Sequence, residues 1–141
     1  MRRYASLTVA GLMFVVGLLL GAQGMGRVMQ SDEVIIPASE GTWTTLDNGW
    51  RRQAIFSGNL TVAVIEAKGP ERGPIQTHHH VHDQVTYVID GEVEVLIGDE
   101  LRQVGSGGAY RVPSDVPHGI RVLTDNARLV DAFTPPREDF R

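Results

Sequence analysis

Short runs of β-forming residues, each bounded by turn-forming residues, follow one another from Ser31 to the end of the chain. Such runs predict strands, and a spacing of about 8 to 12 residues is typical of an antiparallel sandwich or barrel. We expect strands at 42–46, 54–56, 60–66, 85–89, 93–97, 109–112, 119–123 and 128–133. Apolar residues do not recur there at helical spacing, so the sequence predicts an all-β domain.

Two pairs of turn residues predict β-hairpins inside this domain. They are Asp-Gly at 90–91 and Gly-Asp at 98–99, and two-residue hairpin turns favour residues that tolerate positive φ. Between these turns, Val93, Val95 and Ile97 alternate with the other side chains of their run. We therefore expect these three side chains to form one inward apolar face.

The first 30 residues differ from the rest of the chain. Arg2 and Arg3 precede an uncharged, largely apolar stretch at 4–26. This pattern is typical of a signal peptide or a membrane anchor, and both outcomes stay open because the stretch has cleavable small residues and is long enough to cross a bilayer. We expect an N-terminal hydrophobic helix at 1–30 and a folded domain at 31–141 that is exported, whether periplasmic, secreted or membrane-anchored.

Composition excludes several classes of function. The chain has no cysteine, so disulfides, thiolate zinc sites, a cysteine nucleophile and a cysteine lipid anchor are all excluded. Removing the three arginines of the N-terminal segment from the 13 Lys and Arg leaves 10 basic residues against 17 Asp and Glu. A nucleic-acid-binding domain is expected to be basic, so nucleic acid is not an expected partner.

Histidines are the most informative residues for chemistry. The five are His78, His79, His80, His82 and His118. In an extended strand alternate side chains point to the same face, so His78, His80, His82 and Gln84 are expected on one face and His79 on the other. Imidazoles two residues apart on one face can share a metal ion, so we interpret the cluster as a metal site. The alternative is that His79 and His82 are solvated loop residues and His118 is an ordinary partly buried histidine.

The spacing of these residues resembles the two short motifs of the cupin superfamily. The segments read His78-x-His80-x3-Gln84-x6-Gly91 and Gly107-x5-Pro113-x4-His118. The resemblance implies a cupin-like double-stranded β-helix, or jelly-roll barrel, with a divalent metal ion as its cofactor. The metal ligands that it implies are His78, His80, Gln84 and His118. Gln84 stands where the family usually has Glu, and Asp115 stands where the second motif often has Gly.

Glutamine in place of glutamate changes the electrostatics of the expected metal site. Three neutral imidazoles and one neutral amide leave the charge of a divalent ion uncompensated, so the ion is a stronger Lewis acid and its trivalent state is less stable. This favours polarisation of a substrate carbonyl or hydroxyl over dioxygen chemistry. The donor set accepts Mn, Fe, Co, Ni, Cu or Zn, and the sequence does not select among them.

A second group of candidate residues lies near the C-terminus. Asp131 and Phe133 share strand parity, and two prolines then end the strand before Arg137. If Asp131 faces the interior, it is a candidate general acid–base, and Arg137 is a candidate clamp for a substrate carboxylate. In the alternative, Asp131 lies at a strand edge and pairs with Arg128 or Arg137.

The C-terminal pattern Asp-x-Phe-x3-Arg, together with His-x-His-x3-Gln, is similar to the KdgF-type pectin-degradation cupins. Those enzymes linearise unsaturated uronate monosaccharides. The resemblance implies that Asp131 and Arg137 are catalytic and that Phe133 and Arg137 bind substrate. It implies metal-assisted ring opening or isomerisation of a small acidic sugar-like or keto-acid substrate.

Two other functions are compatible with the sequence. One is an iron-dependent dioxygenase on the same fold, and the other is a non-catalytic exported module that only binds a metal or ligand. We interpret Trp43, Trp50, Tyr87 and Tyr110 as core or subunit-contact residues, with Tyr87 facing away from the metal. Because small cupins commonly pair through N-terminal strands, the resemblance also implies a homodimer. Membrane contact is expected only through the N-terminal segment.

Overall fold

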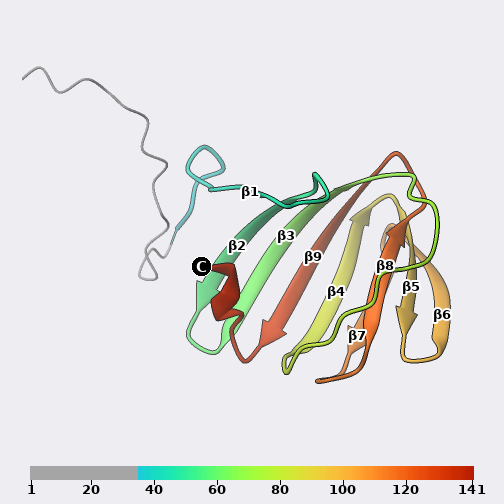
Figure 1. The fold of residues 1–141 in the computed structure, drawn as a ribbon. Coiled ribbons are helices and arrows are strands. Elements are labelled where there is room, and N and C mark those ends of the chain that lie inside the picture. Colours follow the sequence, from blue (N-terminus) through green and yellow to red (C-terminus); the bar gives the residue numbers. More distant parts are fainter. Residues whose placement is uncertain (1–34) are drawn as a thin grey trace, which may run out of the picture.

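Two antiparallel sheets make up the part of the chain that the computed structural model describes, residues 35–141 (Figure 1). The strands are β1 (Thr44–Thr45), β2 (Arg51–Ser57), β3 (Leu60–Lys68), β4 (Asp83–Asp90), β5 (Glu92–Ile97), β6 (Glu100–Gly105), β7 (Ala109–Val112), β8 (His118–Val122) and β9 (Asn126–Thr134). One sheet has the order β1-β2-β3-β9-β4-β7 and the other β6-β5-β8. A short 3-10 helix, η1 (Glu138–Phe140), follows β9. The all-β class is therefore confirmed.

Each of the eight predicted runs overlaps a strand, but β6 was not predicted. The first four residues of β6 are exposed, and the strand lies at the edge of the smaller sheet. An edge strand without a buried face has no alternating apolar pattern to reveal it. Of the predicted run at 42–46, only Thr44 and Thr45 form a strand, β1.

The two predicted hairpin turns have different outcomes. The turn at 98–99 joins β5 to β6, which pair directly, so this hairpin is confirmed. The hairpin at 90–91 is wrong, because β4 pairs with β9 and β7 whereas β5 pairs with β6 and β8. Gly91 instead bends the chain from one sheet to the other with φ of 83°, and a Cβ there would lie 2.4 Å from the Asn126 carbonyl oxygen. Only glycine satisfies both conditions.

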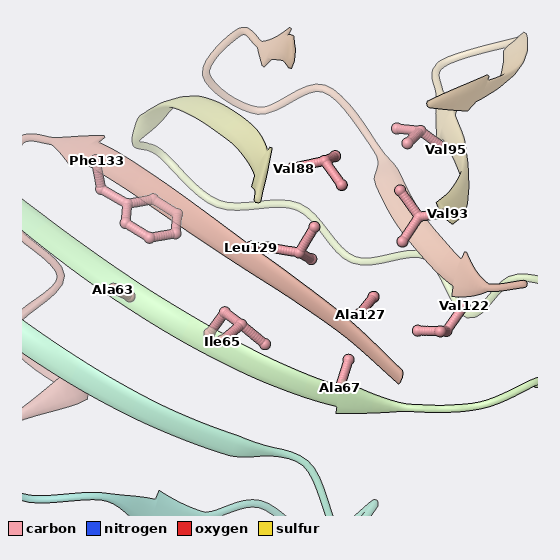
Figure 2. Close-up of a cluster of buried hydrophobic side chains, with 10 residues drawn as sticks. All are labelled: Ala63, Ile65, Ala67, Val88, Val93, Val95, Val122, Ala127, Leu129 and Phe133. Carbon is pink, nitrogen blue, oxygen red and sulfur yellow. The ribbon is translucent and has the colours of Figure 1, made fainter. Parts of the chain in front are cut away.

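The hydrophobic core lies between the sheets (Figure 2). Its members are Ala63, Ile65, Ala67, Val88, Val93, Val95, Val122, Ala127, Leu129 and Phe133. They come from β3, β4 and β9 of the larger sheet and from β5 and β8 of the smaller one. The predicted inward face of β5 is confirmed, since Val93 and Val95 are buried and Ile97 packs against the core.

The predicted N-terminal segment at 1–30 lies outside the described residues. Among residues 35–141, the structure contains no helix with the length and apolar character needed to cross a membrane.

Candidate metal centre

Three histidines converge at the entrance of the space between the sheets. One ring nitrogen of each of His78, His80 and His118 lies within 4.8 Å of the others. The backbone explains this convergence, because His78 and His118 form an antiparallel bridge with two N–H to carbonyl bonds of 2.9 Å. The loop that carries the first two histidines is thus bonded to the start of β8.

Asp115 provides a second tie between the two motif segments. Its backbone N–H donates to the His80 carbonyl at 2.8 Å. Asp115 also has φ of 61°, in the left-handed region that aspartate tolerates better than most residues. This conformation explains physically why a glycine is common at the corresponding motif position.

The hydrogen bonds of these rings leave nitrogen lone pairs for a cation. His118 Nδ1 donates to the Val116 carbonyl at 2.8 Å, so Nε2 is unprotonated, and this buried atom has no partner among the described residues. In the His80 tautomer that donates from Nδ1 to the His82 carbonyl at 3.1 Å, Nε2 faces the Gln84 Oε1 at 3.1 Å. Two lone pairs that face one another are stabilised by a shared cation. The residues present therefore fit a divalent metal ion.

Two of the three rings, those of His78 and His118, have lowered pKa values. Burial, with the neighbouring His118 and His80, lowers the pKa of His78 to about 4. The pKa of His118 is also lowered, mainly by burial. Both rings are thus neutral near pH 7, the form that binds metals.

A chain of hydrogen bonds joins Gln84 to Asp131. The Gln84 amide nitrogen donates to Thr86 Oγ1 at 2.9 Å, and the Thr86 hydroxyl donates to Asp131 Oδ1 at 2.6 Å. The register of β4 with β9 places Thr86 directly opposite Asp131. Because the amide nitrogen is used by Thr86, the amide oxygen is directed at His80.

Asp131 lies inside the cavity rather than in an ion pair with Arg137. Burial raises the pKa of the Asp131 carboxyl to about 6, and the hydrogen bond from Thr86 opposes the rise. The guanidinium of Arg137 instead forms an ion pair with Asp139. A carboxyl group with a pKa near neutrality can both accept and release a proton.

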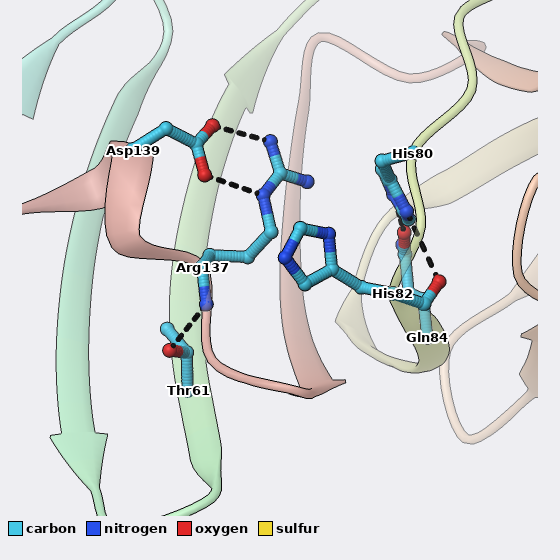
Figure 3. A network of polar contacts seen from close by, with 6 residues as sticks. All are labelled: Thr61, His80, His82, Gln84, Arg137 and Asp139. Carbon is cyan, nitrogen blue, oxygen red and sulfur yellow. Dashed lines mark hydrogen bonds and ion pairs between the residues drawn. The ribbon is translucent and has the colours of Figure 1, made fainter.

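Arg137, which lines the cavity, is held by polar contacts to Thr61 and Asp139 (Figure 3). Its backbone N–H donates to Thr61 Oγ1 at 3.0 Å, and its Nε and Nη2 donate to Asp139 at 2.9 and 2.7 Å. The guanidinium carbon lies 5.1 Å from the centre of the Phe133 ring. The hydrogen bonds from Arg137 lower the pKa of Asp139 to about 2, so this pair is ionised over a wide pH range.

One cavity of about 270 Å³ contains most of the predicted site. Among its lining residues are His78, Gln84, His118, Asp131, Phe133 and Arg137. Of the site residues predicted from the sequence, only His80 lies outside this lining, and its ring centre is 4.8 Å from that of His118. The two groups of candidate residues, far apart in sequence, thus share one cavity.

His79 and His82 stand apart from the three converging nitrogens. His79 is exposed. His82 lies beside Arg137 in Figure 3, with its ring centre 5.3 Å from that of His80 and its Nδ1 buried without a partner among the described residues. Burial and the positive charge of Arg137 lower the pKa of His82.

Three further residues belong to the cavity region without having been predicted there, although Tyr110 was predicted as a core or subunit-contact residue and does pack against the core. Thr86 could have been found in part, because it lies two residues after Gln84 and strand alternation predicts that both side chains point to the same face. Tyr110 lines the cavity and also packs against the core, and burial together with the Asp131 carboxylate raises the pKa of its phenol. Arg52 lines the same cavity from β2, and no local pattern marked it.

Comparison with known proteins identifies relatives over most of the chain. Residues 62–133 match the cupin domain family. The chain is 36% identical over 103 residues to the pectin degradation protein KdgF of Dickeya dadantii, an alignment that spans 72% of this chain and 92% of that protein. The family match includes the three converging histidines, Gln84 and Asp131, and Arg137 lies just beyond it.

Two solved structures are similar in fold to this chain. An RmlC-like cupin from Shewanella frigidimarina is 32% identical, has a TM-score of 0.71, and matches 80% of this chain and 100% of its own. KdgF from Halomonas sp. is 27% identical, has a TM-score of 0.68, and matches 77% of this chain and 99% of its own.

Proposed function

Because the chain belongs to the cupin family, we propose that it is a metal-dependent enzyme that opens or isomerises a small acidic sugar or keto acid. The observation that carries this proposal is the pair of hydrogen bonds that joins Asp131 through Thr86 to Gln84, whose amide oxygen lies 3.1 Å from His80 Nε2 in the histidine cluster. A proton-carrying group and a metal-ligand set in one cavity are the parts that such a reaction needs. A bound divalent ion supplies a Lewis acid that polarises a substrate oxygen.

Each residue of the cavity has a role in this scheme. The metal ligands that we propose are His78, His80, Gln84 and His118. Asp131 moves a proton between substrate atoms, because its raised pKa of about 6 makes both protonation states accessible near neutral pH. Arg137 binds the substrate carboxylate, and Phe133 forms the apolar wall beside it.

Unsaturated uronate monosaccharides are the substrate class that we propose. The relative from Dickeya dadantii is a pectin degradation protein. The Asp-x-Phe-x3-Arg pattern at 131–137 lines the cavity at each of its three named residues, which supports a shared substrate chemistry. The cavity of about 270 Å³ is suited to a single sugar ring rather than a polymer.

An assay of metal-loaded protein on unsaturated galacturonate and guluronate monomers tests the proposal. We expect loss of the ring form by NMR, dependent on metal and unchanged under nitrogen. Turnover that stops without oxygen would identify a dioxygenase instead. Metal and monosaccharide binding with no conversion of uronates or small keto acids would identify a non-catalytic binding module and contradict the proposal.

We further propose that the domain is exported and forms a homodimer. Export is supported by the arginine pair and apolar stretch of the first 30 residues. Dimerisation is supported by Val85, Tyr87 and Ile89, which alternate along β4 on the face opposite the cavity and are 51%, 49% and 44% exposed. Fractionation of cells tests the first proposal, and sedimentation of wild type against Tyr87→Glu tests the second.

A further inference from the structure

The cavity holds a second guanidinium, that of Arg52, to which the proposed reaction assigns no role. Arg52 pairs in register with Ile65, whose side chain faces the core, so the Arg52 side chain starts from the inner face of β2. Its neighbour Arg51 starts from the outer face and forms an ion pair with Glu66. Two adjacent arginines on one strand are therefore placed in opposite environments.

Arg52 and Arg137 contact the same aromatic ring. Their guanidinium carbons lie 3.5 Å and 4.2 Å from the centre of the Phe140 ring, which η1 carries against the cavity. Burial and the positive charge of Arg137 lower the pKa of Arg52. Bringing two cations to one ring is costly unless negative charge is also present.

The negative charge at this end of the cavity is already in use. Asp139 binds Nε and Nη2 of Arg137 and neutralises it. Arg52 forms no ion pair with any other residue in the 35–141 range, although it is half-buried. Nη1 of Arg137 likewise has no hydrogen-bond partner within that range. Asp131 also lines the cavity, but its carboxyl group accepts a hydrogen bond from Thr86 and forms no ion pair with either arginine. Arg52 therefore has no carboxylate partner within that range, and guanidinium donors of Arg52 and Arg137 are free.

We propose that Arg52 is a second carboxylate-binding residue, and that a ligand carboxylate binds between the Arg52 guanidinium and Nη1 of Arg137. This inference rests on the proposed function for the identity of the ligand, a small sugar acid or keto acid. Guanidinium groups match carboxylates in shape and charge, and their bonds are strongest where water is excluded. Asp139 then acts as a positioning residue that fixes Arg137.

Calorimetric titration of the full-length chain tests this assignment without any need for turnover. The probes are D-galacturonate and its neutral methyl ester, each titrated with and without bound metal. We expect Arg52→Gln to weaken galacturonate binding about tenfold or more, because a charge-assisted hydrogen bond is lost, and to change ester binding less than about twofold. Arg51→Gln is the matched control, and we expect it to bind both probes as wild type does.

Equal galacturonate affinity for the two variants would overturn the role of Arg52, as would a wild type with no preference for the acid over the ester. An Arg52 effect that vanishes without metal would also contradict it, because the carboxylate would then bind the ion. The proposed function fails separately: if Arg52→Gln weakens galacturonate binding but wild type converts no uronate or keto acid, the binding residue stands and the enzymatic reaction does not.

Discussion

The two ends of the space between the sheets are built from the same strands but from different residues. On β4, the inward positions change from Gln84 and Thr86 to Val88. On β9, the partners of these residues change from Phe133 and Asp131 to Leu129. One end of each strand therefore supplies polar groups to the cavity, together with the Phe133 ring, and the other supplies aliphatic side chains to the core, of which Leu129 also lines the cavity.

This contrast predicts that stability and chemistry are separable in this protein. The core end removes apolar side chains from water, which favours folding. The cavity end keeps the Asp131 carboxyl and the His118 imidazole away from water, which opposes folding unless ligands compensate. Substitutions at the cavity end are thus expected to impair binding or turnover without lowering the unfolding free energy of the metal-free protein, whereas those at the core end are expected to lower it.

Replacing His118 is expected to have the largest effect on the cavity end. His118→Ala removes one of the three converging ring nitrogens but keeps the backbone bridge to His78. If His118 is a metal ligand, as proposed, the metal affinity falls by more than about 100-fold, a larger loss than is typical when a residue that only hydrogen-bonds to a ligand is replaced. The metal-free protein unfolds as wild type does, within about 1 kcal/mol. Elemental analysis and urea titration measure the two quantities. His79→Ala, at an exposed neighbour of the cluster, is the control, and a metal content equal in both variants would contradict the site.

Replacing Asp131 is expected to separate the proton step from metal binding. Asp131→Asn keeps a hydrogen-bond acceptor for Thr86 but cannot take up a proton, so kcat falls by about 10²- to 10⁴-fold. Metal content stays at the wild-type level. In the metal-free protein at pH 7 the unfolding free energy rises by up to about 3 kcal/mol, because a buried charge is removed. Unchanged turnover would exclude Asp131 from the chemistry.

Replacing Val88 tests the core end of the same strand. Val88 is fully buried, so Val88→Ala should lower the unfolding free energy by about 2–3 kcal/mol. Its metal affinity should match that of wild type. The control is Val81→Ala, at a side chain that is 62% exposed, with an expected change below about 0.5 kcal/mol. Loss of metal binding in Val88→Ala, measured under conditions where it is folded, would show that the two ends are coupled.

Features set by local patterns were predictable from the sequence. Alternation placed Val93 and Val95 on the inner face of β5, and His78, His80 and His118 were recognised from their spacing. Features set by strand register were not. The turn at Gly91 crosses between sheets because β4 pairs with β9, which no residue near the turn reveals.

Long-range pairing also explains the missed residues of the cavity. Thr86 becomes part of the site only because the register of β4 and β9 brings it to Asp131. Arg52 becomes part of it because the register of β2 and β3 places it opposite the inward residue Ile65, and the Phe140 ring of η1 contacts its guanidinium. The edge strand β6 was missed for the opposite reason, since it has no buried face to produce a pattern.

The smallest expected effect is on how the free energy of unfolding depends on pH. It distinguishes a substitution at the cavity end, Asp131→Asn, from one at the core end, Val88→Ala. In the metal-free protein, His78 has a pKa of about 4 against an ordinary value of 6.5, so unfolding takes up protons and stability falls as the pH falls through this window. Asp131 acts in the opposite sense, because its pKa rises from 3.8 to about 6 and its contribution to stability is lost as the pH rises through that range. The two contributions partly cancel in wild type between pH 4 and 6.

Urea titrations at several pH values test this cancellation. In Asp131→Asn the free energy of unfolding should fall more steeply with falling pH than in wild type, by up to about 1.4 kcal/mol per pH unit. In Val88→Ala it should be lower than in wild type by the same amount at every pH. Parallel pH profiles for Asp131→Asn and wild type would mean that this carboxyl does not have a raised pKa.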